Sequence, residues 1–371
     1  VHCWETVPLA FSRYGRAVRH LLPAAVWVSA SGWVARRRLD YLLDRLRPDV
    51  INVHNLHMAA WTGWSPDILR VCTRHAPTVW TLHDMWSFTG GCVYAYDCRK
   101  FVSGCDASCA LTDEGPTTSP RLAAHAWRQR QWLFATCPEL DAVAPSRWLA
   151  TEAGAGPWAG HRVEVIPNGL PVHVYEPVDR NLAREVLGVR SPGPVLLVAV
   201  ADLAEKRKGG MLLIESLRRL SIRPYTLLIL GSGSVELEEE GVTVLHLGYI
   251  GHERTKALVY SAADLLIHPA PVDNLPNVIV EAMACGTPAA GFPVGGVPEL
   301  IRPVLTGWLA GSLAPASLAE TVQQAWAELD GGLDLRSACR RVVESEYDVE
   351  LQAARYLHLF EELTGGAPTD R

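Results

Sequence analysis

One stretch of sixteen residues, from Asp273 to Pro288, constrains the fold of this chain more than any other part of the sequence. It reads Asp-Asn-Leu-Pro-Asn-Val-Ile-Val-Glu-Ala-Met-Ala-Cys-Gly-Thr-Pro and follows a short apolar run at 263–268. The apolar run predicts a buried strand. Asn274 is a good helix N-cap, Pro276 suits the first helical turn, and Gly286 ends a helix. The stretch therefore predicts a strand, a loop and a helix that begins at the carboxyl end of the strand.

This arrangement also predicts where a ligand binds. Open α/β sheets bind ligands at the carboxyl ends of their strands, and the N-terminus of a helix favours a phosphate there. Two carboxylates, Asp273 and Glu281, lie eight positions apart, which is a rise of about 12 Å in a helix. Glycosidase carboxylates lie about 5–5.5 Å or about 6.5–9.5 Å apart. The spacing therefore favours a long ligand with a diphosphate in its middle, and two ordinary helix carboxylates remain the alternative.

Composition excludes several classes of function. The net charge of −6, with 20% charged and 49% hydrophobic residues, argues against a nucleic-acid binder and indicates a large core. A chain of 371 residues is long enough for two domains. The sequence shows no signal-peptide pattern and no apolar run long enough to span a bilayer, so at most peripheral membrane contact is expected. Nine cysteines without an export signal favour reduced thiols and a cytoplasmic protein.

The motif that contains Asp273 and Glu281 resembles the donor-site signature of a known family. An acidic residue, seven intervening positions, a glutamate and Ala-Met-Ala-Cys-Gly-Thr-Pro resemble the retaining glycosyltransferases of family 4. The form Asp-Asn-Leu-Pro-Asn resembles the branch of colanic-acid and exopolysaccharide glycosyltransferases, which has a similar cysteine-rich loop. Asp273 takes a position where glutamate is more usual. The resemblance extends from about residue 35 to residue 362.

The resemblance implies an α/β protein with the GT-B fold, in which two Rossmann-like domains with parallel sheets face each other across a cleft. It implies an acceptor-side domain at 1–170, a donor-binding domain at 171–345, and a helix at 346–371 that crosses back to the first domain. Family members begin with an apolar strand and a glycine-rich turn. Nothing before residue 35 has that pattern, so one or two β-α units of the first domain are expected to be missing.

The resemblance also implies roles for individual residues. Glu281 would hold the nucleotide ribose, and Asp273 would contact the transferred sugar. Lys208 matches a family lysine that binds the donor diphosphate, and Arg207 takes the second cationic position because the usual Gly-Arg after the preceding strand is Ala-Asp here. His83 matches a family histidine that contacts the donor sugar. The remaining predicted donor-binding residues are Asn274, Leu275, Pro276, Asn277, Gly209, Gly231 and Gly233.

Simpler interpretations remain open for several of these residues. A histidine at a strand end is more often structural than catalytic, which applies to His83 and also to His54 and His57, the candidates for the acceptor side. A basic turn such as 206–208 can be merely solvated. The Arg-rich segment 120–135 predicts a surface helix or contact with a charged acceptor.

Four cysteines lie close together in the predicted loop at 90–110, at positions Cys92, Cys98, Cys105 and Cys109. Four thiolates can hold a tetrahedral zinc ion, but these spacings are not the usual Cys-x2-Cys pairs. A structural zinc ion, free thiols, and disulfides or a cluster are therefore alternatives. No catalytic cofactor is expected, because no Asp-x-Asp motif offers a clamp for a metal-bound diphosphate.

The sequence thus predicts a glycosyltransferase that moves a sugar from a nucleotide-diphosphate sugar to an acceptor hydroxyl with retention of configuration. The acceptor can be a glycan, a lipid-linked molecule or a small molecule. One alternative is a catalytically impaired homologue that binds sugar nucleotides or serves as a partner subunit. Another is a nucleotide-sugar epimerase of the same fold, against which the Asp273–Glu281 motif and the later Gly-Gly-x-Pro-Glu segment argue.

Overall fold

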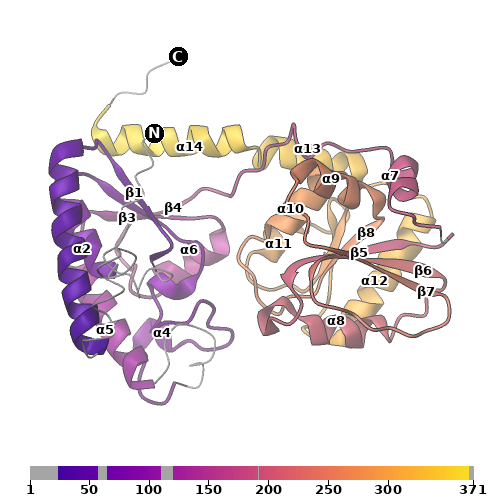
Figure 1. Ribbon diagram of the computed structural model, residues 1–371, viewed down its shortest axis with the longest axis horizontal. Coiled ribbons are helices and arrows are strands. Elements are labelled where there is room, and N and C mark those ends of the chain that lie inside the picture. Colours follow the sequence, from indigo (N-terminus) through magenta and orange to yellow (C-terminus); the bar gives the residue numbers. More distant parts are fainter. Residues whose placement is uncertain (1–23, 57–64, 110–119, 191, 367–371) are drawn as a thin grey trace. The chain divides into compact units, whose positions relative to one another are not determined.

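The computed structural model describes residues 24–56, 65–109, 120–190 and 192–366, with side chains from residue 32 onward. These residues form two compact units. One unit consists of the chain up to Ile166 and from Tyr356 onward, and the other consists of Pro167–Arg355. Each unit has its own parallel β-sheet with helices around it (Figure 1).

The first unit contains a four-stranded parallel sheet in the order β1-β2-β3-β4. Its strands are β1 (Ile51–His54), β2 (Thr78–Thr81), β3 (Leu140–Ala144) and β4 (Val163–Val165). Its helices are α2 (Ala24–Leu46), η3 (Pro66–Ile68), α3 (Leu69–His75), η4 (Met85–Ser87), α4 (Lys100–Ser103), α5 (Pro120–Thr136) and α6 (Arg147–Gly154). Apolar side chains of α2 and α3 pack on β1, where Leu43 and Val71 are buried against Ile51 and Val53.

The second unit contains a six-stranded parallel sheet in the order β10-β9-β8-β5-β6-β7. Its strands are β5 (Val195–Asp202), β6 (Tyr225–Ser232), β7 (Val242–Gly248), β8 (Leu265–His268), β9 (Ala289–Gly291) and β10 (Gly307–Leu309). Its helices are α7 (Arg180–Val186), η6 (Lys206–Lys208), α8 (Gly210–Leu217), α9 (Glu253–Ala262), α10 (Asn277–Ala284), α11 (Val297–Leu300), α12 (Pro315–Asp330) and α13 (Arg336–Glu346). Strands β5 and β8 are nearly continuous apolar runs because helices cover both of their faces.

The strand order of the second sheet contains a topological switch point. The chain passes from β5 to β6 and β7 on one side, and then returns to place β8 on the other side of β5. The loops that follow β5 and β8 therefore leave the sheet in opposite directions, which opens a crevice at their carboxyl ends. The fold thus places the loops that contain Lys208 and Asp273 at the position where such sheets bind ligands.

The last helix, α14 (Val349–Thr364), takes part in both units. Its residues up to Arg355 belong to the second unit. From Tyr356 onward it belongs to the first unit, where Leu359 is buried with Val79 and Val143 of the sheet. The boundary between the units falls at Ile166 and Pro167, a few residues before the expected boundary at 170.

One predicted helix start differs from the structure. Helix α10 begins at Asn277, with Pro276 as its N-cap, so Asn274 is not the N-cap. The reason is that the backbone N–H of Asn274 donates to the side chain of Asp273, at 2.9 Å, and this turn precedes the helix.

Among the helices that the structure describes, none combines the length and apolar character that a membrane crossing requires.

Candidate functional site

The candidate site lies at the switch point of the second sheet and is built around an ion pair. Lys208 ends the short helix η6 after β5, and Asp273 lies in the loop after β8. The Lys208 Nζ atom lies 3.2 Å from Asp273 Oδ2, and both side chains are largely buried. The fold therefore brings together two residues that are far apart in the sequence.

Asp273 is a buried carboxylate that is kept ionised by its neighbours. Burial by itself raises the pKa of Asp273, but His268, Lys208 and the N–H of Asn274 together hold that pKa below its ordinary value. His268 Nε2 lies 3.7 Å from Asp273 Oδ2. Since burial lowers the pKa of His268 to about 4, this imidazole is neutral near pH 7. Lys208 and the Asn274 N–H are therefore the groups that stabilise the Asp273 charge at that pH.

The backbone of Asp273 is fixed by a glycine pair in the Gly-Gly-x-Pro-Glu segment. Gly295 has a φ of +55°, and a Cβ atom at this position would lie 1.8 Å from the Asp273 carbonyl oxygen. The N–H of Gly296 donates to the same carbonyl at 3.3 Å. Only glycine allows such a close approach at a positive φ. The sequence signal for this contact is the glycine pair itself, but the sequence does not show that the pair holds Asp273.

Glu281 lies on α10 and is surrounded by hydrogen-bond donors. Tyr260 Oη donates to its Oε2 at 2.6 Å, and Lys256 Nζ and Tyr175 Oη donate to its Oε1 at 3.0 and 3.2 Å. The Lys256 ammonium also lies 5.2 Å from the centre of the Tyr175 ring. A carboxylate has about four acceptor positions, so Oε2 retains one for a further donor.

No sequence pattern singles out the three donors around Glu281. Lys256 and Tyr260 lie four positions apart on α9, so they share one face of that helix. Tyr175 comes from the segment before α7. Burial raises the pKa of Tyr260 well above its ordinary value, and the nearby Glu281 charge raises it further, so its hydroxyl remains a donor. The available signal was that a buried carboxylate requires donors, but the sequence alone does not say which residues supply them.

The two predicted cations of the basic turn after β5 contact different carboxylates. Lys208 contacts Asp273, whereas Arg207 pairs with Glu205 at 3.1 Å, and both of these side chains are partly exposed. Gly209 follows with a φ of +74°, and a Cβ atom there would lie 2.0 Å from the carbonyl oxygen of Pro269. The structure therefore joins Lys208 and Gly209 to the loop after β8, but it does not bring Arg207 to Asp273.

The other predicted donor-binding residues occupy different environments. Asn274 and Leu275 are buried, and the Asn277 side chain accepts a hydrogen bond from Asn168 at 3.3 Å. Gly231 has a φ of +121°, and a Cβ atom there would lie 1.6 Å from the carbonyl oxygen of Val200. Gly233 has a φ of +96°. The two glycines thus allow the ends of β5 and β6 to approach each other.

His83 belongs to the first unit and is paired with another histidine. It follows β2, and its Nε2 atom lies 2.9 Å from Nδ1 of His54 at the end of β1. Burial lowers the pKa of His54, and the proximity of His83 lowers it further. This hydrogen bond requires one nitrogen to donate and the other to accept, so at least one of the two rings is neutral. His57 lies outside the described residues.

The cysteine-rich loop does not form the predicted zinc site. Within the described residues, none of Cys92, Cys98, Cys105 and Cys109 forms a disulfide. Burial raises the pKa of Cys92 to about 12, and the nearby thiols of Cys109, Cys105 and Cys98 contribute to this increase. Within the described part of the chain, no group of three or more His, Cys, Asp or Glu side chains is arranged to hold a metal ion. The structure therefore favours the free-thiol alternative.

We expect the second unit to lose stability in mild acid because His268 is buried as the neutral imidazole. Its pKa is about 4 in the folded protein and about 6.5 in an unfolded chain. Between these values the unfolded chain binds more protons, so stability falls as the pH falls, by up to about 3 kcal/mol. Melting temperatures of the wild type and of His268→Gln should therefore be measured from pH 7 to about pH 4.5. The control is His252→Gln, at an exposed histidine; an H268Q profile as steep as that of the wild type would contradict the expectation.

Two protein-family models match separate parts of the chain. Residues 4–174 match the model described as Glycosyltransferase Family 4, and residues 194–328 match the model described as Glycosyl transferases group 1. Both matched segments are thus similar to glycosyltransferase domains, in agreement with the class that the Asp273–Pro288 motif resembles. The first match begins at residue 4, so the expectation that the resemblance starts near residue 35 is wrong.

Individual relatives support the same class. The chain is 30% identical to D-inositol 3-phosphate glycosyltransferase of Segniliparus rotundus over 166 residues, which are 42% of this chain and 37% of the relative. It is 28% identical to the putative colanic acid biosynthesis glycosyl transferase WcaC of Escherichia coli over 267 residues, which are 69% of this chain and 62% of the relative. The matches thus span 37% of the length of the first relative and 62% of the length of the second.

Solved structures confirm the predicted GT-B fold. Sucrose-phosphate synthase from Thermosynechococcus elongatus has a TM-score of 0.68 at 19% identity, and the match covers 93% of this chain and 80% of that chain. Anabaena HepE in complex with UDP-glucose has a TM-score of 0.60 at 18% identity, with coverages of 93% and 84%. Likeness at these identities establishes the two-domain α/β architecture and no more.

Proposed function

We propose that this protein transfers a sugar from a nucleotide-diphosphate donor to an acceptor hydroxyl, with retention of the anomeric configuration. The observation that carries the proposal is the Lys208–Asp273 ion pair at the switch point of the second sheet. A fixed cation and a fixed carboxylate at this position suit a ligand that combines a diphosphate with a hydroxyl-rich sugar.

On this proposal the second unit binds the donor. Lys208 stabilises the diphosphate as it leaves, and Asp273 accepts hydrogen bonds from sugar hydroxyls. The free acceptor position on Glu281 Oε2 holds a ribose hydroxyl, because the three donors around this carboxylate fix its orientation. The N-terminus of α10 stabilises a nearby negative charge, such as that of the diphosphate, through its free N–H groups and the helix dipole. Protein groups then contribute orientation and charge stabilisation rather than a covalent intermediate.

Three further residues have roles in this proposal. Arg207 forms an ion pair with Glu205. It therefore contributes to diphosphate binding only if this ion pair breaks and its guanidinium turns toward the ligand. His83, in the first unit, contacts the transferred sugar, and His54 fixes the orientation of its ring through their hydrogen bond. The first unit binds the acceptor. Uridine donors should be tested first, because HepE was solved with UDP-glucose.

The test of this proposal is ligand-dependent thermal stability. UDP-, GDP-, ADP- and dTDP-sugars should be added to the wild type and to Glu281→Gln. A donor at about one hundred times its Kd stabilises the wild type by about 2.7 kcal/mol. Loss of a hydrogen bond to a charged group costs about 1.5–3 kcal/mol, so the same concentration should stabilise E281Q by only about 1 kcal/mol or less.

A matched variant separates loss of the site from loss of one negative charge. Glu320→Gln changes an exposed glutamate on α12 of the same unit, and it should respond to the donor as the wild type does. Equal stabilisation of the wild type and E281Q would contradict the role of Glu281. Stabilisation without release of nucleotide in the presence of acceptors would favour the alternative, a homologue that binds sugar nucleotides without turnover.

A further inference from the structure

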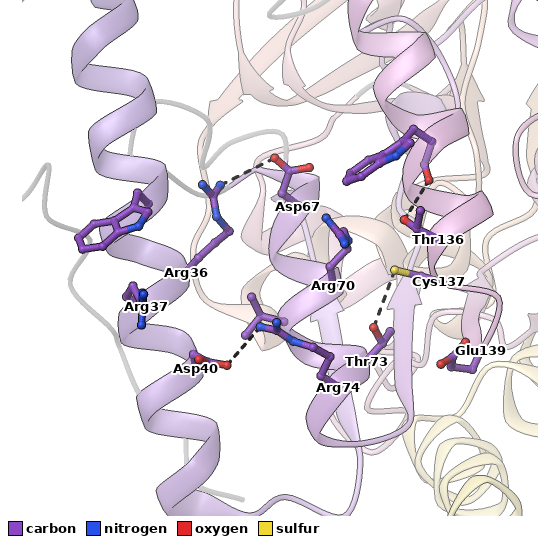
Figure 2. A pocket seen from close by; sticks show the side chains of 13 residues that line it. Arg36, Arg37, Asp40, Asp67, Arg70, Thr73, Arg74, Thr136, Cys137 and Glu139 are labelled. Atoms are coloured by element: carbon purple, nitrogen blue, oxygen red, sulfur yellow. Dashed lines mark hydrogen bonds and ion pairs between the residues drawn. The ribbon is translucent and has the colours of Figure 1, made fainter.

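A second candidate site lies on the first unit, away from the carboxyl ends of its strands. Helices α2, α3 and α5 and the segment just before β3 surround a hollow of about 750 Å³ (Figure 2). Two of its lining residues, Cys137 and Glu139, come just before β3. They lie at the amino edge of the sheet, whereas His54 and His83 lie at the carboxyl edge. The hollow is therefore distinct from the candidate site described above.

Four arginines line this hollow and give it a positive side. Arg36 and Arg37 come from α2, and Arg70 and Arg74 come from α3. The chain as a whole has a net charge of −6, so a group of four guanidinium groups is a local exception. Arginine presents several N–H donors in a planar fork, which matches the oxygens of a phosphate.

Two of these arginines are held by aromatic rings. The guanidinium of Arg37 lies 5.5 Å from the centre of the Trp33 ring, and that of Arg70 lies 4.4 Å from the centre of the Trp132 ring. Stacking fixes the plane of a guanidinium but leaves the N–H groups at its edge able to donate. Among the residues that the structure describes, no carboxylate lies within ion-pair distance of Arg37 or Arg70.

The other two arginines have weak partners. Arg36 lies 3.8 Å from Asp67, and Arg74 lies 3.3 Å from Asp40, with both carboxylates partly exposed. Asp40 also receives a closer contact from His75, at 3.0 Å. Pairs of this kind contribute little to stability. Arg36 and Arg74 can therefore turn toward a ligand without a large cost.

The acidic residues of the hollow restrict the kind of anion that fits. Asp40, Asp67 and Glu139 line it together with the arginines, and they would repel a ligand with negative charges along its whole length. Carboxylates instead accept hydrogen bonds from hydroxyl groups. The exposed rings of Trp33 and Trp132, with 57% and 48% of their surface accessible, provide apolar faces against which a sugar ring can pack.

We propose that this hollow binds the phosphate ester of a sugar or polyol, with arginines of its lining donating to the phosphate and the carboxylates accepting from the hydroxyls. The same chemistry occurs in soluble sugar phosphates and in the headgroups of phosphoinositol lipids. The volume of the hollow lies within the range of about 300–1,000 Å³ that is usual for small-molecule sites. This proposal does not depend on the proposed transferase activity.

Binding measurements with two probes test the proposal. Glucose 6-phosphate is titrated calorimetrically in a phosphate-free buffer, and vesicles of phosphatidylcholine with phosphatidylinositol are tested by co-sedimentation. The variant to be compared with the wild type is the double substitution Arg37→Gln/Arg70→Gln. Each lost charge-assisted hydrogen bond weakens binding about tenfold or more, so the double variant should bind about 100-fold more weakly.

The control removes the same charge from the same unit. Arg121→Gln/Arg128→Gln changes two exposed arginines of α5 that do not line the hollow. Binding of either probe that is lost in R37Q/R70Q and retained in R121Q/R128Q supports the site, and the probe that binds identifies a soluble or a lipid source. Equal weakening in both double variants, or no binding of either probe to the wild type, overturns the proposal. Thermal melting of both variants verifies that they fold.

Discussion

Replacing Lys208 by methionine is expected to slow nucleotide release from the donor by a factor of about 100–1,000. This is the usual cost of removing one fixed group that stabilises charge developing in a transition state. Methionine keeps most of the length of the side chain but has no charge, so packing around the buried stem is largely preserved. The measurement is the turnover number at saturating donor, taken with whichever nucleotide sugar stabilises the wild type.

A second readout distinguishes loss of charge stabilisation from structural damage. Lys208 is one of the groups that lower the pKa of Asp273, while burial raises it. Without Lys208 the carboxyl should therefore protonate at a higher pH, and the acid limb of the activity profile should shift upward. Lys206→Met, at an exposed position of the same turn, is the control. Equal losses of turnover in K208M and K206M would show that only the general charge of the turn matters.

The GT-B fold as a whole was predicted from the family resemblance, and individual elements were predicted from local signals. The apolar run at 263–268 predicted β8, and the turn residues that follow it predicted a helix after that strand. Parallel sheets buried on both faces leave such runs in the sequence. The start of α10 was predicted wrongly because a side-chain contact, from Asp273 to the N–H of Asn274, competes with helix formation.

The candidate site could be predicted only in part, because its second layer depends on contacts between distant residues. The motif located Asp273 and Glu281, but Tyr175 and Lys256 reach Glu281 from other segments. The sequence also gave no way to separate two adjacent cations. In the structure Arg207 pairs with Glu205, whereas Lys208 reaches Asp273, and this difference depends on the direction of the turn after β5.

Glycine 209 should tolerate substitution far less well than another glycine of the same unit with the same backbone conformation. Gly209 and Gly188 have φ values of +74° and +70°. Alanine at either position adds the cost of a left-handed residue, about 1 kcal/mol or more. At Gly209 the new Cβ would also lie 2.0 Å from the carbonyl oxygen of Pro269, whereas at Gly188 nothing lies within 4 Å. We therefore expect Gly209→Ala to destabilise by about 4 kcal/mol and Gly188→Ala by about 1 kcal/mol.

Chemical denaturation of both variants measures this difference, and donor binding shows its functional consequence. The clash at Gly209 can be relieved only if the loop after β5 moves away from the loop after β8, and these loops contain Lys208 and Asp273. G209A should therefore lose donor binding even under conditions in which it remains folded, while G188A should retain it. If the two variants were equally stable, the contact between Gly209 and Pro269 would not constrain the protein in solution. If G209A were destabilised but bound the donor normally, the glycine would serve packing alone, and the assignment of the basic turn to the diphosphate would rest on Lys208.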